Sequence, residues 1–358
     1  MQRCVSGPVF VGLCAVAALS ALVKQDSRLR ARGARYRADV AVELGYALSS
    51  EEHGPNDLVR NARAAEEAGF TFALISDHYH PWVDAQGQSP FVWSVIGGIA
   101  QSTQRLRLGT GVTCPTIRIH PAIIAQAAAT SQVMMEGRFF LGVGTGEELN
   151  EHVTGARWPG PQERLEMLEE AIEVLRLLRE GGYQSYYGKH YTVEQARIYT
   201  LPDEPPPIAV AAAQPNAAEL AGRVGDAFIG VAPEEELVQQ FDEAGGSGKP
   251  RYGQVTVCYA ESEEEAKQTA FEIWPNAGLE GPLSQELAIP SHYEAAAQLL
   301  TADDVAETVI CGPDPERHLE AIREFEQAGY THVYVHQVGR DQEPFFRFYS
   351  ERILPNLG

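Results

Sequence analysis

The sequence is poor in cysteine, and the few cysteines that it has are scattered. Five occur among 358 residues, none of them in a C-x-x-C pair or near a histidine at metal-ligand spacing. We therefore expect neither a disulfide framework nor a structural zinc site. The five residues are Cys4, Cys14, Cys114, Cys258 and Cys311.

Basic residues are also scarce. The chain has 28 Lys and Arg against 49 Asp and Glu, which gives a formal net charge of −21. Because residues 1–37 hold seven of the basic residues and one aspartate, the remainder carries about −27. A field of this sign repels phosphate backbones, and no local basic stripe offsets it. A nucleic-acid partner is not expected.

The apolar run Val9–Val23 is too short for a comfortable membrane span. It has 15 residues between Arg3 and Lys24, whereas a spanning helix needs about 20. The run resembles a signal peptide or short anchor, although it lacks a twin-arginine pair and has a poor cleavage pattern. The other interpretation is a translated upstream region. Either way we predict a signal-like or non-structural segment at residues 1–37.

The remainder, residues 38–358, is predicted to form a single domain. We expect a cytoplasmic location with no stable membrane partner; export or membrane anchoring is the alternative if residues 1–23 act as a signal. From Val42 onward, short β-favouring runs alternate with helical ones. Eight such runs match the number that a closed parallel barrel requires, so an α/β fold, a (β/α)8 TIM barrel with insertions, is predicted. The predicted strands begin at Val42, Phe70, Arg105, Arg138, Ile208, Ala227, Gln254 and Thr331.

Two stretches interrupt this alternation. Residues 181–207 are rich in tyrosine and then in proline, which predicts an inserted hairpin. Residues 261–300 are less regular and predict helices with loops. An echo between Glu66–His78 and Glu326–Gln337 supports a recurring joint between helix and strand. Two Rossmann halves could produce the same echo, so that alternative stays open.

Polar residues follow the strand predicted over Phe70–Ser76. Asp77 and His78 come directly after it, and Pro81 and Trp82 then form a rigid turn with an aromatic ring. In parallel α/β folds, ligands are held at the carboxyl ends of strands. The alternative is that Asp77 caps a turn and His78 is an ordinary polar residue.

A glycine-rich turn follows the strand predicted over Arg138–Gly144. In Gly142–Gly146, alternate glycines allow backbone N–H groups to approach a ligand oxygen. The spacing fits neither the dinucleotide fingerprint nor a Walker loop, and a simple strand-to-helix turn is the alternative. Glu147 could stabilise a helix start or exchange a proton beside a histidine.

Further candidates follow other predicted strands. Gly111 permits unusual backbone geometry against a flat ligand. Glu51 and Glu52 could serve the site or be solvated loop residues, and Cys114 is read as a small filler. Because strand ends gather at one face of a barrel, these segments would meet. The small residues after the fifth strand are Ala211, Ala212, Ala213 and Gln214.

Three stretches together resemble a known family. They are S-D-H-Y-H-P-W at Ser76–Trp82, G-T-G-V-T-C-P-T at Gly109–Thr116 and F-L-G-V-G-T-G-E-E-L-N-E at Phe140–Glu151. They are similar to the luciferase-like class of coenzyme F420 (deazaflavin) dependent oxidoreductases, within it to the F420-dependent glucose-6-phosphate dehydrogenase subgroup. The resemblance runs from about Val42 to the C-terminus. It implies a barrel with insertions, a homodimer and a cofactor across the carboxyl ends of the strands.

The resemblance also implies roles for individual residues. His78 would accept a hydroxyl proton as hydride leaves carbon, which suits an imidazole near neutral pH. Trp82 and Glu51 would shape the pocket, and Glu147 would supply or stabilise the proton at the reduced ring. The Gly111–Val112 bond would be a non-proline cis peptide behind the ring. The residues expected to hold the cofactor are Asp77, Gly111, Val112, Thr145, Gly146, Asn150, Ala211, Ala212, Ala213 and Gln214.

One departure from the subgroup concerns the substrate. The sugar-phosphate enzymes grip phosphate with two Lys and one Arg, and the matching positions here fall near Ala232–Glu234, at Glu294 and at Thr308, none of them basic. A phosphate dianion would be poorly held there. We therefore expect hydride transfer between F420 and an organic substrate that is an unphosphorylated alcohol. The alternatives are an FMN-dependent luciferase-like monooxygenase and a non-catalytic deazaflavin carrier.

Overall fold

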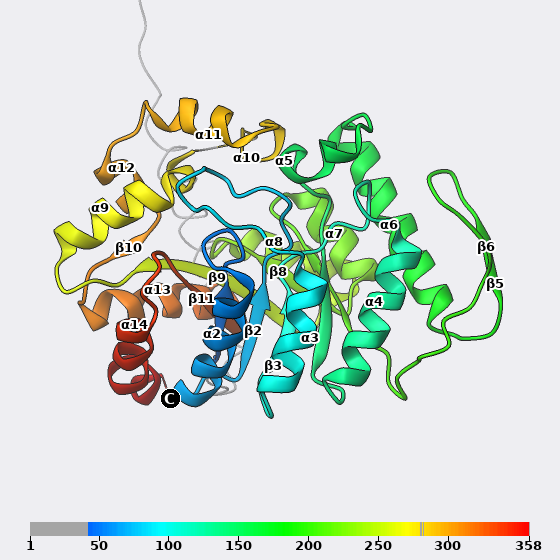
Figure 1. The fold of residues 1–358 in the computed structure, drawn as a ribbon, viewed down its shortest axis with the longest axis horizontal. Helices are drawn as coiled ribbons and strands as arrows, with labels where there is room; N and C mark the ends of the chain where they lie inside the picture. The colour runs from blue at the N-terminus through cyan, green and yellow to red at the C-terminus, as the bar shows by residue number, and fades with distance from the viewer. Residues whose placement is uncertain (1–41, 280, 282, 358) are drawn as a thin grey trace, which may run out of the picture. The chain divides into compact units, whose positions relative to one another are not determined.

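Eight parallel strands close into a barrel (Figure 1). The computed structural model describes residues 42–357 except 280 and 282, so the predicted N-terminal segment lies outside the described residues. The barrel closes because the last strand pairs with the first and the sixth pairs with the seventh. The predicted TIM barrel is confirmed. Its strands are β1 Glu43–Leu48, β2 Phe72–Ile75, β3 Arg107–Thr110, β4 Phe139–Val143, β7 Ile208–Ala211, β8 Ala227–Gly230, β9 Arg251–Cys258 and β11 His332–Gln337.

Helices cover the outside of the barrel. Several begin with a proline in the first turn, where its missing N–H costs nothing and its fixed φ suits the helix. The first of them ends at Gly69, whose φ of 108° is a left-handed cap that favours glycine. The covering helices are α2 Pro55–Ala68, α3 Val92–Ser102, α4 Pro121–Met134, α6 Pro161–Leu178, α7 Pro215–Val224, α8 Glu235–Phe241 and α13 Pro315–Gln327.

Aromatic rings set against glycines fill the barrel interior. A Cβ at Gly45 would lie 2.4 Å from the Phe72 ring, and one at Gly109 would lie 2.1 Å from the Phe140 ring. The Phe140 ring in turn stacks on Tyr252, with centroids 5.1 Å apart. The interior is therefore a packed core, which leaves the ends of the barrel as the places for chemistry.

Two insertions extend the framework. The predicted hairpin is confirmed as β5 Gln184–Tyr187 and β6 Thr192–Ala196, paired antiparallel. Residues 261–309 form short helices, and in Figure 1 α10 and α11 lie on the same side of the barrel as α5, Glu148–Glu151. The helices of this insertion are α9 Glu263–Ile273, the 3-10 turn η3 Pro275–Gly278, α10 Leu283–Glu286, α11 Pro290–Ala297 and α12 Ala302–Ala306.

Some elements are not predicted by the sequence pattern. The two-residue strand β10, Ile310–Cys311, pairs with the end of β9 and is too short to leave a periodic pattern. Helix α14, Glu343–Phe348, continues into a π-helical turn, Tyr349–Ile353. It packs its aromatic side chains against Tyr46 and Phe70.

Within the described part of the chain, none of the helices combines the length and the apolar character needed to cross a membrane. The cytoplasmic location stays a prediction.

Candidate active site

Loops from the first four strands meet at the carboxyl end of the barrel, with His78 among them. Its Nε2 lies 3.3 Å from Oε1 of Glu51, and the two side chains are 10% and 3% exposed. The Trp82 ring lies beside the imidazole, with centroids 5.0 Å apart. The structure thus brings together three of the four predicted catalytic residues, and the imidazole keeps an accessible edge.

Glu51 is held by two serines. Its Oε2 accepts hydrogen bonds from Ser76 Oγ at 2.5 Å and from Ser49 Oγ at 3.1 Å. Burial by itself raises the pKa of this carboxyl, but the neighbouring His78 ring and the Ser76 hydroxyl outweigh that effect, so the pKa lies below its ordinary value. Glu51 is therefore ionised at neutral pH and sits as a fixed negative charge beside the imidazole.

Asn150 links Glu147, the fourth predicted catalytic residue, to the His78–Glu51 pair. Its Nδ2 lies 3.1 Å from His78 Nδ1 and donates to Glu147 Oε2 at 3.3 Å. Its Oδ1 accepts from the backbone N–H groups of Tyr79 at 2.8 Å and His80 at 3.3 Å. The Asn150 side chain is buried. It therefore fixes the loop that carries His78, and its predicted contact with a cofactor stays a prediction.

Asp77 is also occupied by protein partners. Its Oδ1 accepts from Arg118 Nη2 at 2.8 Å, and its Oδ2 accepts from Thr113 Oγ1 at 2.7 Å. Arg118 reaches a second carboxylate, with its Nε 3.6 Å from Glu151 Oε1. Burial raises the pKa of Glu151. Arg118 and Glu151 are not among the site residues predicted from the sequence. In a chain with few basic residues, an arginine just beyond the Gly109–Thr116 motif could have indicated that Arg118 pairs with a carboxylate there.

Small residues follow β3, β4 and β7 at the carboxyl end of the barrel, and we call this set the rim. The Gly111–Val112 peptide is cis, as expected from the family resemblance. Val112, Thr145 and Ala211 are half-buried, whereas Ala213 and Gln214 are exposed. Gly146 has a φ of 88°, which favours glycine. Of the other two predicted rim positions, Gly111 is half-buried and Ala212 is buried. This uncharged rim beside a His–Glu pair is sterically and chemically suited to a flat, uncharged ring.

The positions expected to match a phosphate grip make contacts within the protein. Glu294 Oε1 accepts from the Asp84 backbone N–H at 3.0 Å. The Thr308 hydroxyl lies 3.1 Å from the carbonyl oxygens of Ala277 and Val305. The Ala232 carbonyl oxygen accepts from the Tyr330 hydroxyl at 2.8 Å. None of these positions presents a cation.

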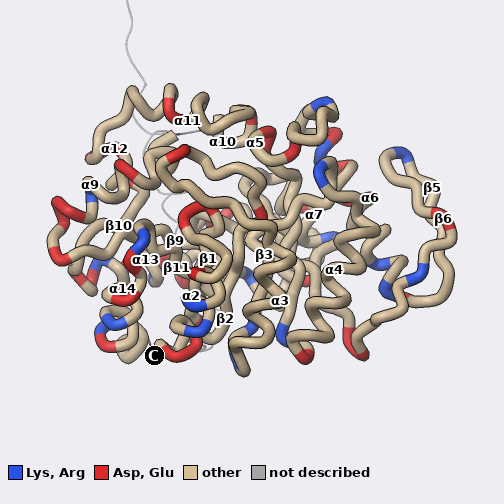
Figure 2. The backbone as a smooth tube through the Cα atoms, in the orientation of Figure 1, with Lys and Arg blue, Asp and Glu red and all other residues tan. Residues whose placement is uncertain are grey.

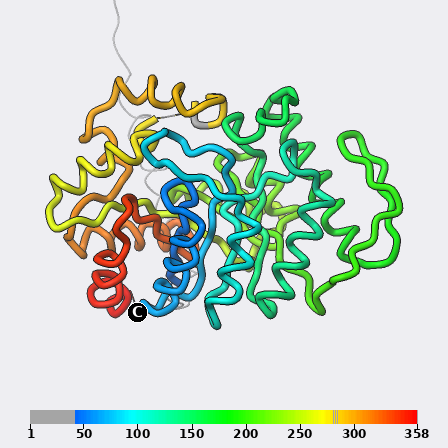
Figure 3. The backbone as a smooth tube through the Cα atoms, in the orientation of Figure 1, coloured from blue at the N-terminus to red at the C-terminus, as the bar shows by residue number. Residues whose placement is uncertain are grey.

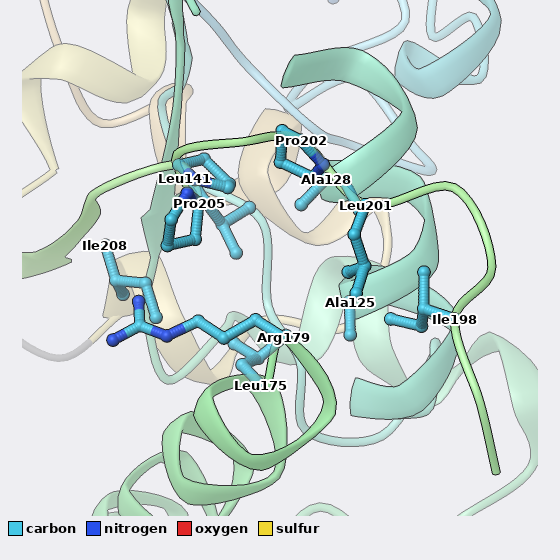
Figure 4. A pocket seen from close by; sticks show the side chains of 12 residues that line it. Ala125, Ala128, Leu141, Leu175, Arg179, Ile198, Leu201, Pro202, Pro205 and Ile208 are labelled. Carbon is cyan, nitrogen blue, oxygen red and sulfur yellow. The ribbon is translucent and has the colours of Figure 1, made fainter. Parts of the chain in front are cut away.

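A cavity of about 30 Å³ lies outside the barrel, between α4, α6 and the chain that leads into β7 (Figure 4). Its volume matches one or two water molecules, which is too small for a cofactor. Among the residues that the structure describes, no three His, Cys, Asp or Glu side chains meet as metal ligands.

Comparisons with known proteins agree with this architecture. A family model described as luciferase-like monooxygenase matches residues 40–332. An F420-dependent glucose-6-phosphate dehydrogenase from Microbacterium testaceum (strain StLB037) is 37% identical over 331 residues, covering 89% of this chain and 98% of that relative. A protein of the same description from Nakamurella multipartita is 36% identical over 333 residues, covering 88% and 96%.

A solved structure is similar as well. It is an F420-dependent secondary alcohol dehydrogenase in complex with an F420-acetone adduct, with a TM-score of 0.82 and 29% sequence identity. The match covers 87% of this chain and 98% of that chain.

Proposed function

Since the chain belongs to the luciferase-like monooxygenase family, we propose that it is a coenzyme F420-dependent oxidoreductase. It moves a hydride between the deazaflavin and an organic substrate. The similarity to F420-dependent dehydrogenases extends over nearly their whole length. The observation that carries the proposal is the His78–Glu51 pair, because a partly exposed imidazole beside a buried carboxylate is suited to accept a hydroxyl proton.

His78 accepts the proton of the substrate hydroxyl while the carbon gives up a hydride. When bound, F420 supplies the two-electron acceptor for that hydride. The Glu51 carboxylate stabilises the imidazolium that forms, as the buried acid does in a Ser-His-Asp triad. Glu147, which accepts a hydrogen bond from Asn150, would supply or stabilise the proton at the reduced ring. The alcohol becomes a carbonyl compound, because its hydroxyl hydrogen leaves as a proton and its carbon hydrogen leaves as a hydride.

In this proposal the small-residue rim would hold the cofactor. Uncharged side chains allow a flat ring to approach the backbone without a steric or desolvation penalty. Asp77 and Asn150 support this rim from below through Thr113, Arg118 and the His78 loop. The residues proposed to touch the cofactor are Gly111, Val112, Thr145, Gly146, Ala211, Ala212, Ala213 and Gln214.

The substrate is an unphosphorylated alcohol. Beside Trp82, the cluster of Val83, Leu149 and Tyr293 is apolar and buried, which suits a carbon-rich molecule. Glu294 is engaged by the Asp84 backbone and cannot be replaced by a phosphate-binding lysine without losing that bond. Glucose 6-phosphate, which the relatives' descriptions name, is the second candidate.

The test is a direct comparison of substrates and cofactors. Purified protein is mixed with oxidised F420 and either a panel of secondary alcohols or glucose 6-phosphate, and the loss of F420 absorbance is followed. Turnover of alcohols above that of glucose 6-phosphate supports the proposal, and the reverse order overturns the substrate class. Tight FMN binding with oxygen consumption, and no F420 binding, would instead indicate the monooxygenase.

We also propose a homodimer that is formed through α3 and α4. Neither helix contains a charged residue, and both are uncoloured along their lengths in Figure 2. Ile123 and Met134 of α4 are nevertheless exposed, as is Phe91 at the N-cap of α3. In a chain with a net charge of −21, a charge-free face lets two copies meet without repulsion between carboxylates. Ile123→Asp should shift the mass measured by light scattering from dimer to monomer, whereas a monomeric parent would refute the proposal.

A further inference from the structure

The loop that carries Trp82 lies against the insertion. This loop joins β2 to α3 and runs beside residues 261–309, drawn as a cyan tube against a yellow and orange one in Figure 3. Contacts between them join residues about 190 positions apart in the chain. The insertion therefore reaches the catalytic end of the barrel although none of its residues was among the predicted site residues.

Gln86 makes the central contacts of this loop. Its side chain is fully buried. Its Oε1 accepts from the Trp82 backbone N–H at 2.8 Å. Its Nε2 donates to the Ile273 carbonyl oxygen at 3.0 Å and to Asn276 Oδ1 at 3.3 Å. One amide group thus ties the backbone of Trp82 to the end of α9 and to η3, with both ends of the amide satisfied.

Trp82 is held from a second direction by α11. Its ring contacts both the imidazole of His78 and the ring of Tyr293, at centroid distances of 5.0 Å and 5.3 Å. Glu294, the next residue of α11, accepts from the Asp84 backbone N–H. The indole is therefore in contact with both the proposed catalytic imidazole and the insertion.

We infer that Gln86 is a positioning residue: through it the insertion sets the place of Trp82, and with it the width of the space beside His78 that a substrate enters. The inference rests on the proposed function for the meaning of that space. The geometry itself does not depend on the substrate, because the hydrogen bonds of Gln86 belong to the protein alone.

Two variants of Gln86 test the acceptor oxygen and the donor nitrogen of its side-chain amide. Gln86→Glu has the same shape and can still accept from Trp82, but it cannot donate to Ile273 or Asn276. Gln86→Met fills the same space and loses all three bonds. We expect KM for bulky alcohols to change by about 10-fold in Gln86→Met, with kcat within about 3-fold, because substrate binding is altered and the His78–Glu51 pair is not. The change should be at least as large in Gln86→Glu, because a buried carboxylate oxygen then faces the acceptor oxygens of Ile273 and Asn276.

The experiment measures KM and kcat for alcohols of increasing size, from propan-2-ol through cyclohexanol to 1-phenylethanol, together with F420 affinity. Gln88→Glu is the matched control, since it introduces the same charge on an exposed side chain of the same loop. Expected is a changed size preference in the Gln86 variants at unchanged F420 affinity, and none in the control. An unchanged size preference in variants that bind F420 would overturn the inference.

Hydrogen exchange tests the coupling without any substrate. The Trp82 amide donates to Gln86, so exchange in peptides covering residues 79–91 and 273–278 should be faster in Gln86→Met and unchanged in Gln88→Glu. Asn276→Ala, which removes one partner from the insertion side, should give a smaller increase. If alcohols fail as substrates but exchange changes as expected, the proposed function fails and the coupling holds. If exchange in both segments is unchanged, the inference fails whatever the substrate.

Discussion

A histidine and a glutamate meet at each end of the barrel, and the two pairs are alike in distance but differ in their surroundings. At the carboxyl end, His78 and Glu51 are 3.3 Å apart; at the amino end, His332 and Glu43 are 3.5 Å apart. Both imidazole side chains are 10% exposed. Distance and exposure of the imidazole therefore do not distinguish a candidate base from a packing residue.

The surroundings make the difference. Glu43 is 45% exposed and is shared with Arg107 and the Thr71 hydroxyl. His332 packs on Tyr252 at a centroid distance of 4.5 Å and lies beside the Thr331 hydroxyl. Burial lowers the pKa of His332 to about 4. The amino-end pair is thus a neutral ring with a solvated, occupied carboxylate, whereas Glu51 is buried and faces His78.

The strongest test removes the two imidazoles in turn. His78→Gln should lower kcat/KM by about 1,000-fold, because a general base contributes 10²–10⁴-fold, while F420 affinity is retained. His332→Gln, the matched control at the other end, should leave kcat/KM within about 3-fold. Comparable losses in both variants, measured by F420 absorbance, would show that the two ends do not differ as described.

Replacing the two carboxylates gives the next largest effect. Glu51→Gln keeps the shape and one acceptor for Ser76 but removes the charge beside His78, so we expect kcat/KM to fall by about 100-fold. Glu43→Gln should have no measurable effect on turnover. Steady-state kinetics with saturating F420 measure both. Full activity in Glu51→Gln would remove the role assigned to this charge.

The framework of this site is readable in the sequence because it is local. Each strand end is marked by a change from apolar to polar residues, so Glu51, His78 and Glu147 can be placed at one end of a barrel from periodicity alone. The surroundings of His332 cannot be predicted in this way. Nothing in the run Thr331–Gln337 indicates that its first histidine lies beside the aromatic side chains of Phe72 and Tyr252. The family resemblance, not spacing, supplied the cis peptide at Gly111.

The supporting residues could not be predicted for the opposite reason. Asp84 meets Glu294 across 210 positions, and Gln86 meets Asn276 across 190. A glutamine in a polar loop and a glutamate on a short helix look solvated in the sequence, and only the packed fold pairs them. The same holds for Arg118, whose partners Asp77 and Glu151 come from two other strand ends.

The amino-end pair should make the stability of the protein depend on pH. The His332 pKa is about 4 in the fold against an ordinary value of about 6.5, so the unfolded chain binds more protons between these values. Stability therefore falls as pH drops from about 6.5 to 4, by an amount on the order of 2 kcal/mol from this residue. Urea unfolding at several pH values should be steeper in pH for the parent than for His332→Gln. Parallel profiles would contradict the assignment.

The carboxyl end holds a second buried His–Glu pair, which should have little effect on turnover. His336 Nε2 and the Gly339 N–H both bind Glu52, each at 2.8 Å, and both side chains are buried. His336 Nδ1 has no partner among the described residues. In Glu52→Gln the imidazole can move its proton to Nδ1, so that Nε2 accepts from the new amide N–H while the amide oxygen still accepts from Gly339. Both contacts of residue 52 are then kept, and Nδ1 stays the unpaired atom that it already is in the parent. We expect a stability loss of about 1 kcal/mol or less and kcat/KM within about 3-fold. A loss of turnover as large as that of Glu51→Gln would mean that the two neighbouring glutamates act on His78 as one unit.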